Sequence, residues 1–203
     1  MIRNFLFDIG NVLLHFDLIP ALRKLNHRPD LSFEASMEIL IHHRDLMEDG
    51  SITASQFLDG IMHDLAFPGT TEQARAIYAA IFTPNPPNWE LAKVLKSAGY
   101  RLVLFSNISP IHADYVEEKY PDLALFDEAI FSFRVGDIKP RPGMYRYAQE
   151  NLGMLPSETY FIDDKIENIE TGKNMGFVTH HYDHVHHAAL LEDLRARGIP
   201  VPA

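Results

Sequence analysis

The feature that most constrains the fold is a set of continuous apolar runs, far apart in the chain, that each end in polar residues. The runs are residues 3–8, RLVLFS at 101–106 and TYFIDD at 159–164. Strands of a parallel sheet that is covered on both faces have this continuous apolar pattern. Each run is therefore predicted to be a buried strand of a parallel sheet.

Helix and strand patterns alternate through the second half of the chain. Helices are expected at about 87–97, from Ser109-Pro110, from Pro142 to about Gly153, between the run 159–164 and Gly176, and at about 188–197, and strands at 128–133 and 177–181. Alternation of this kind is typical of an α/β fold with right-handed crossovers. We expect a Rossmann-like α/β core made of residues 1–15 and 84–203.

Residues 16–83 have a helical pattern without a strand signal. Thr53 to Gln56 and Thr70 to Gln73 both fit a capping box, which opens a helix. The block is therefore predicted to be an inserted helical-bundle cap domain, with the proline-rich TPNPPNW at 83–89 as a hinge. An insertion after the first strand lies at the carboxyl edge of the sheet, where α/β folds bind ligands.

Composition excludes several classes of protein. The 203 residues contain no cysteine, so disulfides and thiolate chemistry are excluded. The chain has no apolar run of about 18 residues and no signal-peptide pattern, so a cytoplasmic protein without a membrane partner is expected. A net charge of −10 argues against a nucleic-acid partner. We expect a monomer or a homodimer that acts on a small molecule.

Polar residues follow the strand-like runs in a particular pattern. Asp8 ends the first run, Ser106 and Asn107 end the second, and Asp163 and Asp164 end the third. One acid at a strand end is commonly a cap or turn residue, but the joint pattern favours a functional site. The ends of parallel strands meet at one edge of the sheet, and crowded carboxylates there would need a cation. Hard oxygen ligands suit Mg²⁺.

Lys139, in VGDIKPRP at 135–142, adds a positive charge after another strand. A Mg²⁺ ion, a lysine and the Ser106 hydroxyl together would neutralise a phosphoryl group, which is most of the work in phosphoryl transfer. A remaining carboxylate could then act as the nucleophile. The residues thus predict phosphoryl-transfer chemistry.

At these positions the whole chain resembles the haloacid dehalogenase superfamily of phosphohydrolases. The resemblance is carried by Asp8-Ile9-Gly10-Asn11-Val12, by Ser106 in LFSN, by Lys139, and by Asp163, Asp164 and Asn168 in FIDDKIEN. The helical insertion is similar to the small cap of that family. FDIGNVLLHFD most resembles the branch that contains bacterial α-D-glucose-1-phosphate phosphatases, and the phosphatase domain of soluble epoxide hydrolase is a more distant relative.

The resemblance implies a Mg²⁺-dependent phosphatase that forms an aspartyl-phosphate intermediate. It makes Asp8 the nucleophile and a metal ligand, and it makes Ser106, Asn107 and Lys139 the groups that bind the phosphoryl oxygens. The metal site is expected to be completed by Asp164, Asp163 and the backbone carbonyl of Gly10. The expected substrate is a small phosphorylated metabolite, with a sugar phosphate as one candidate.

Gly10 departs from the family pattern. The family usually has an aspartate there, which protonates the leaving group and activates water, and such proton transfers are worth about 10²–10⁴-fold in rate. Three interpretations stay open: a slow enzyme, a substrate with a good leaving group, or another acid. That acid could be His15, Asp17 or a residue of HHRDLMED at 42–49, although Asp17 could equally cap a helix that begins near Ile19.

Two other functions are considered. The chain could be a non-hydrolytic phosphate-binding or regulatory relative that lost turnover at Gly10. A haloacid dehalogenase is less favoured, since those enzymes carry an aromatic residue where this chain has Gly10. A response-regulator receiver is excluded because its acidic pair comes first in the chain.

The histidine-rich THHYDHVHH at 179–187 is interpreted as a solvated loop rather than a metal site. His180 and His181 are expected in the last strand, with their side chains on opposite faces.

Overall fold

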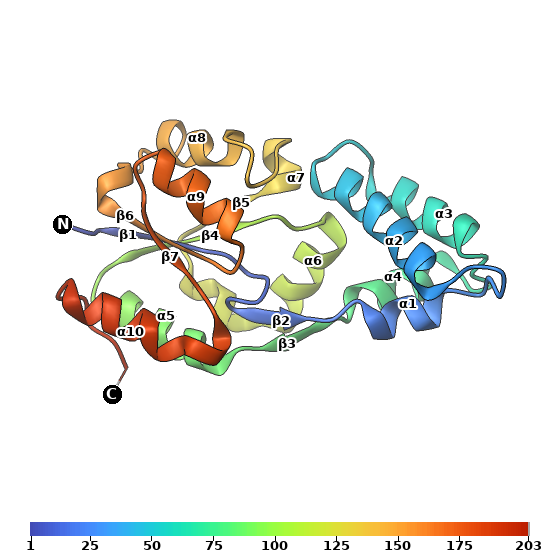
Figure 1. Ribbon diagram of the computed structural model, residues 1–203, viewed down its shortest axis with the longest axis horizontal. Coiled ribbons are helices and arrows are strands. Elements are labelled where there is room, and N and C mark those ends of the chain that lie inside the picture. Colours follow the sequence, from blue (N-terminus) through green and yellow to red (C-terminus); the bar gives the residue numbers. More distant parts are fainter. Residues whose placement is uncertain (203) are drawn as a thin grey trace.

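A computed structural model describes residues 1–202. Its main sheet has five parallel strands in the order β5-β4-β1-β6-β7 (Figure 1). The strands are β1 (Asn4–Phe7), β4 (Arg101–Ser106), β5 (Glu128–Phe131), β6 (Thr159–Asp163) and β7 (Val178–His181). The predicted α/β fold with a parallel sheet and a helical insert is confirmed.

Helices cover both faces of the sheet. One face packs against α5 (Pro86–Ser97), α6 (Pro110–Lys119) and α10 (His187–Ala196), and the other against α8 (Gly143–Glu150) and α9 (Ile166–Asn174). Phe5 and Phe7 of the central strand belong to the first hydrophobic cluster, and Leu6 belongs to the second. Successive side chains of a strand point to opposite faces, so a continuous apolar run fills both cores.

The inserted block forms four helices with a hydrophobic cluster of their own. They are α1 (Ile19–Leu25), α2 (Phe33–Glu48), α3 (Ala54–Asp64) and α4 (Thr71–Ala79). Both predicted capping boxes are present, at Thr53 and Thr70. Figure 1 shows this bundle as a separate lobe beyond the carboxyl edge of the sheet.

The two chain crossings between the lobes differ from the sequence prediction. They pair as an antiparallel two-stranded sheet, β2 (Leu14–Phe16) with β3 (Phe82–Pro84). The expectation of no strand between 16 and 83 was therefore wrong, because the crossings lie side by side and satisfy each other's backbone groups. The proline-rich segment is a strand end followed by the first turn of α5, where proline fits. We propose that the boundaries between the core and the cap lie near residues 16 and 83, and the β2–β3 pair supports these positions.

Short elements complete the chain. Strand β5 ends two residues before its predicted end, since Ser132 is already the first residue of α7 (Ser132–Val135). The Ser132 hydroxyl accepts the Ile108 N–H and donates to the Ile108 carbonyl. The 3₁₀ turns are η1 (Pro121–Leu125), η2 (Pro156–Glu158) and η3 (His184–His186). Within residues 1–202, no helix has the length and apolar character to cross a bilayer.

Candidate active site

The register of the sheet brings the predicted strand-end residues together. Phe7 pairs with Leu104 on one side and with Ile162 on the other, so Asp8 lies between the ends of β4 and β6. The Asp8 N–H donates to the carbonyl of Ile162 at 3.0 Å, which fixes the backbone there. The convergence that the sequence predicted is therefore present.

Three carboxylates form a cluster at this edge. Asp8, Asp163 and Asp164 each have an oxygen within 4.8 Å of the others. Burial raises the pKa of Asp8 to about 7, with Lys139 opposing the rise and the other two carboxylates adding to it. Burial also raises the pKa of Asp164. A divalent cation would relieve this repulsion, and a set of hard carboxylate oxygens fits Mg²⁺.

Lys139 is the buried cation of the site. Its Nζ lies 2.6 Å from Asp163 Oδ2 and 3.2 Å from Asp8 Oδ1, and it donates to the carbonyl of Phe105 at 2.6 Å. Burial alone would lower the pKa of Lys139, but Asp163 and Asp8 hold it above its usual value. The lysine is therefore charged and fixed beside Asp8, where a phosphoryl oxygen could reach it.

Both carboxylate oxygens of Asp163 accept hydrogen bonds from protein donors. Its Oδ2 accepts from Lys139, and its Oδ1 accepts from the Lys165 N–H and the Asn168 amide, both at 2.9 Å. These bonds orient the lysine and the loop that leads into α9. Direct metal ligation by Asp163 stays a prediction.

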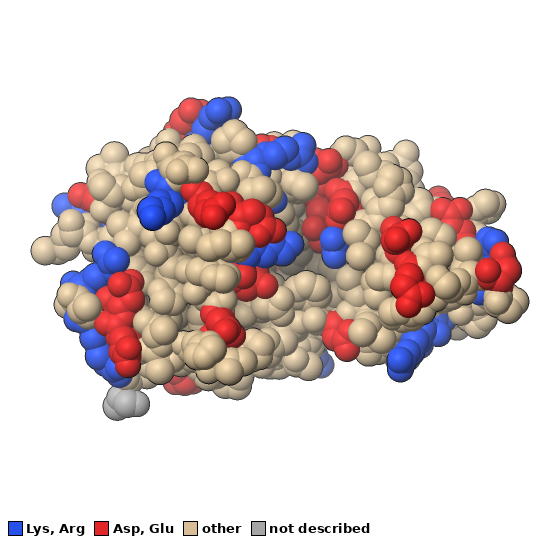
Figure 2. Space-filling view, viewed as in Figure 1, with Lys and Arg blue, Asp and Glu red and all other residues tan. Residues whose placement is uncertain are grey.

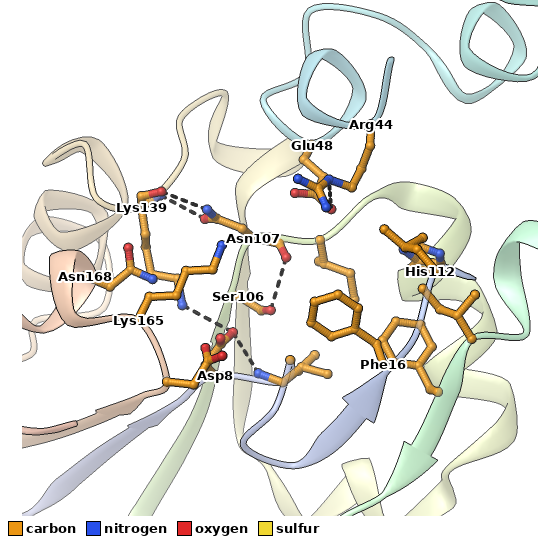
Figure 3. Close-up of a pocket in the computed structure, with 17 residues that line it drawn as sticks. Asp8, Phe16, Arg44, Glu48, Ser106, Asn107, His112, Lys139, Lys165 and Asn168 are labelled. Carbon is orange, nitrogen blue, oxygen red and sulfur yellow. Dashed lines mark hydrogen bonds and ion pairs between the residues drawn. The ribbon is translucent and has the colours of Figure 1, made fainter. Parts of the chain in front are cut away.

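Ser106 and Asn107 play different parts in the geometry (Figure 3). The Ser106 side chain is buried and lines the cavity above Asp8. The Asn107 amide donates to the Lys139 carbonyl and accepts from the Lys139 N–H, both at 2.8 Å. Asn107 thus holds the lysine loop against β4, and its contact with substrate stays a prediction.

A cavity lies between the core and the cap, and Figure 2 shows the hollow there with charged side chains on its rim. One wall is apolar: Phe16, Leu18, Ile81, Phe82 and Ile108. The cap also contributes Arg44 and Glu48 from α2. The cavity therefore has charged groups at the sheet edge and on the cap, whereas much of the remaining wall is apolar.

Sequence reasoning missed several residues of the site. Asn11 donates to Asp164 Oδ2 at 2.9 Å from a backbone with φ of 55°. Asparagine tolerates that conformation better than most residues, so an asparagine at this strand exit was a signal. Phe16 and His112 also line the cavity. Their positions follow from packing between the lobes, and no sequence pattern indicated them.

The structure distinguishes among the residues that could replace the acid missing at position 10. The ring of His15 packs against that of His184 with centroids 5.1 Å apart, away from the cavity lining. Asp17 does not line the cavity, and its carboxylate accepts the Ile19 N–H at 2.9 Å in the turn that leads into α1, whose N-cap is Leu18. From residues 42–49, Arg44 and Glu48 line the cavity.

The histidine-rich segment lies beside the site rather than in it. His180 and His181 belong to β7, as predicted, and His181 Nε2 lies 2.9 Å from the backbone carbonyl oxygen of Asp164. His184 and His186 are exposed, in agreement with the predicted solvated loop. Among residues 1–202, the three-carboxylate cluster is the group with metal-ligand spacing.

The fold and the site together define a protein of the α/β class in which a strand-end carboxylate faces a buried lysine beneath a helical cap. The chain belongs to the haloacid dehalogenase-like hydrolase family, whose model matches residues 2–176. This agrees with the resemblance found in the sequence.

Individual relatives span most of the chain. The D-ribitol-5-phosphate phosphatase of Bacteroides thetaiotaomicron is 26% identical over 196 residues, which is 88% of this chain and 91% of that protein. The sesquiterpene phosphatase astK of Aspergillus oryzae is 28% identical over 177 residues, 87% of each chain. A HAD family enzyme of B. thetaiotaomicron, solved with magnesium and inorganic phosphate, superposes with a TM-score of 0.77 at 26% identity, covering 91% of this chain and 96% of that one.

Proposed function

We propose that this protein is a Mg²⁺-dependent phosphatase that hydrolyses a small phosphorylated metabolite through an aspartyl-phosphate intermediate. The observation that carries the proposal is the placement of Asp8. Its carboxylate lies 3.2 Å from Lys139 Nζ, within the three-acid cluster and under the cap cavity. The phosphatase names of two relatives and the magnesium and phosphate in a related structure support the same chemistry.

Each site residue has a role in this reaction. An Asp8 oxygen forms a bond to phosphorus while the bond from phosphorus to the leaving oxygen breaks. Lys139 and Ser106 hold the phosphoryl oxygens, and Asn107 keeps the lysine loop in place. The carboxylates and the Gly10 carbonyl would hold Mg²⁺, which supplies charge neutralisation at the phosphoryl group. Water then attacks phosphorus, and Asp8 leaves as a carboxylate.

The residues of the cavity walls indicate which class of substrate would fit. The leaving group would contact the aromatic rings of Phe16 and Phe82 on one side and the polar side chains of Arg44 and Glu48 on another. A sugar or polyol presents both C–H faces and hydroxyls, so a sugar phosphate fits these walls. We also propose that the chain belongs to the α-D-glucose-1-phosphate phosphatase branch of the family. The polyol phosphate in the name of one relative supports this class of substrate.

A screen of phosphate release with Mg²⁺ tests the function. The panel contains sugar 1-phosphates, terminal sugar and polyol phosphates, an isoprenoid phosphate and 4-nitrophenyl phosphate, with Asp8→Asn as the control. Release by the wild type and not by the variant is expected. Binding of phosphate esters without any release would instead support the non-hydrolytic, regulatory alternative.

A further inference from the structure

The direction in which the leaving group departs determines where its proton must come from. In phosphoryl transfer the attacking and leaving oxygens lie roughly in line on opposite sides of phosphorus. Asp8 attacks from the sheet edge, so the leaving oxygen departs toward the cap. Gly10 offers no acid at that point, and a replacement must therefore face the cavity from the cap side.

Glu48 occupies such a position. It is the last residue of α2 and lines the cavity, and Figure 3 shows it with Arg44 on the cap side, across from Asp8 and Ser106. Its side chain is 15% exposed. The nearest Arg44 contact, from Nε to Glu48 Oε1, is 3.9 Å, which is longer than a hydrogen bond. The carboxyl group is therefore mostly shielded from solvent and is not held in a hydrogen-bonded ion pair with Arg44.

We infer that Glu48 supplies the acid and base that Gly10 lacks. This inference rests on the proposed phosphatase function and names the residue that completes it.

Glu48 gives up a proton in the first step and regains one in the second. As Asp8 bonds to phosphorus, the electron pair of the breaking P–O bond passes to the leaving oxygen, which takes the proton of the Glu48 carboxyl group. The products are an alcohol, aspartyl phosphate and the Glu48 carboxylate. In the second step that carboxylate takes a proton from the attacking water, the Asp8–phosphorus bond breaks, and inorganic phosphate and the protonated Glu48 remain.

Other polar groups near the cavity fit the role less well. His112 Nε2 lies 3.0 Å from the carbonyl oxygen of Tyr78, and burial lowers the pKa of His112 to about 4, so it is neutral and its N–H is already used. Arg44 does not release a proton near neutral pH. Asp45 pairs with Arg44, and Asp49 accepts the Ser51 N–H; neither lines the cavity.

The electrostatic environment of Glu48 supports the assignment. Burial raises the pKa of Glu48 to about 7; Arg44 opposes the rise, Asp45 adds to it, and Lys165 and Lys139 of the core oppose it from across the cavity. The buried Tyr78 hydroxyl also faces this charge, and its own pKa is raised by burial and then by Glu48. A group that titrates near neutral pH suits both proton donation and proton removal.

The test compares Glu48→Gln with Glu38→Gln, a matched substitution at an exposed position of the same helix. Values of kcat/KM are measured with Mg²⁺ for esters whose leaving groups range from nitrophenol to a primary alcohol. Glu48→Gln should lose about 10²–10⁴-fold on the alkyl ester and much less on the aryl ester, which needs little protonation. Glu38→Gln should match the wild type on both.

Two further readouts separate proton transfer from binding or folding. The wild-type rate on alkyl esters should fall as the pH rises through about 7, and Glu48→Gln should lack this limb. Glu48→Asp keeps an acid and should recover part of the alkyl-ester rate, and Glu48→Ala should recover rate with added formate.

Equal losses on aryl and alkyl esters, or a change confined to KM, would overturn the inference and make Glu48 a substrate-binding residue. Wild-type rates in Glu48→Gln would overturn it too. Those results leave the phosphatase function standing, whereas a wild type that releases no phosphate from any ester removes the function itself and the inference with it.

Discussion

The ring of Phe16 occupies the space into which a side chain at Gly10 would extend. A Cβ at Gly10 would lie 3.2 Å from Phe16 Cε1 and 3.5 Å from Cδ1. Gly10 is not among the glycines with positive φ, so its backbone does not forbid a side chain. Phe16 is 37% exposed, so we expect its ring to turn toward solvent. The acid that is usual in the family is thus replaced by an aromatic wall of the cavity, contributed by β2.

This relationship predicts that Gly10→Asp folds and restores an acid once the Phe16 ring turns aside. In a Glu48→Gln background, Gly10→Asp should raise kcat/KM on an alkyl phosphate by at least about tenfold, as part of the 10²–10⁴ available from proton transfer. Gly10→Ala in the same background adds the Cβ without the acid and is the control. A well-folded Gly10→Asp, Glu48→Gln protein no faster than Glu48→Gln alone would contradict the prediction.

Replacement of the nucleophile should separate activity from stability. Asp8→Asn should reduce phosphate release to background, because the amide cannot attack phosphorus. Without metal, the variant should also be more stable, since it removes one of three crowded carboxylates. A gain of about 1 kcal/mol would raise Tm by about 2–4 °C in a chain of this size. Hydrolysis at the wild-type rate would refute the aspartyl-phosphate mechanism.

Removal of the metal should abolish turnover reversibly. Dialysis against a chelator is expected to stop phosphate release, and added Mg²⁺ should restore it, because the carboxylate cluster and the phosphoryl group repel without a cation. Mg²⁺ should also raise Tm in the wild type by mass action, and less in Asp8→Asn. Full activity without any metal would instead revive the dehalogenase interpretation.

The stability of the metal-free protein should fall as the pH rises. The folded state raises the pKa of Asp8 from 3.8 to about 7 and that of Glu48 from 4.5 to about 7, so it holds these protons more tightly than the unfolded chain. Each group stabilises the fold fully at low pH, and that stability is lost between about pH 4 and pH 7. The loss amounts to at most about 4 kcal/mol for Asp8 and about 3 kcal/mol for Glu48. Urea unfolding in chelator from pH 5 to pH 8 measures it, and the loss should be smaller in Asp8→Asn and in Glu48→Gln.

Removal of the buried lysine charge should destabilise the protein strongly. Lys139→Met leaves Asp8 and Asp163 without their cation and should cost about 3–5 kcal/mol at pH 8. The cost should be smaller at pH 5, where Asp8 is protonated. The control is Lys96→Met, whose ion pair with Asp127 is about one-third exposed and should contribute less than about 1 kcal/mol. Equal effects of the two substitutions would contradict the electrostatic role of Lys139.

The sequence by itself determined the sheet, the capped helices and the convergence of Asp8, Ser106 and Asp163. These features follow from local sequence patterns, because a continuous apolar run defines a strand buried on both faces and a capping box defines a helix start. Once the strands are parallel, residues at their carboxyl ends must share one edge. Gly10 could likewise be recognised as a missing acid from the motif alone.

Only the tertiary structure decided which groups surround that edge. Glu48 faces Asp8 because the cap packs over the sheet edge. Likewise, Asn107 binds the Lys139 backbone, which lies 32 residues away in the chain. These outcomes depend on how separately folded segments pack, and side-chain periodicity within each segment carries no information about contacts between them.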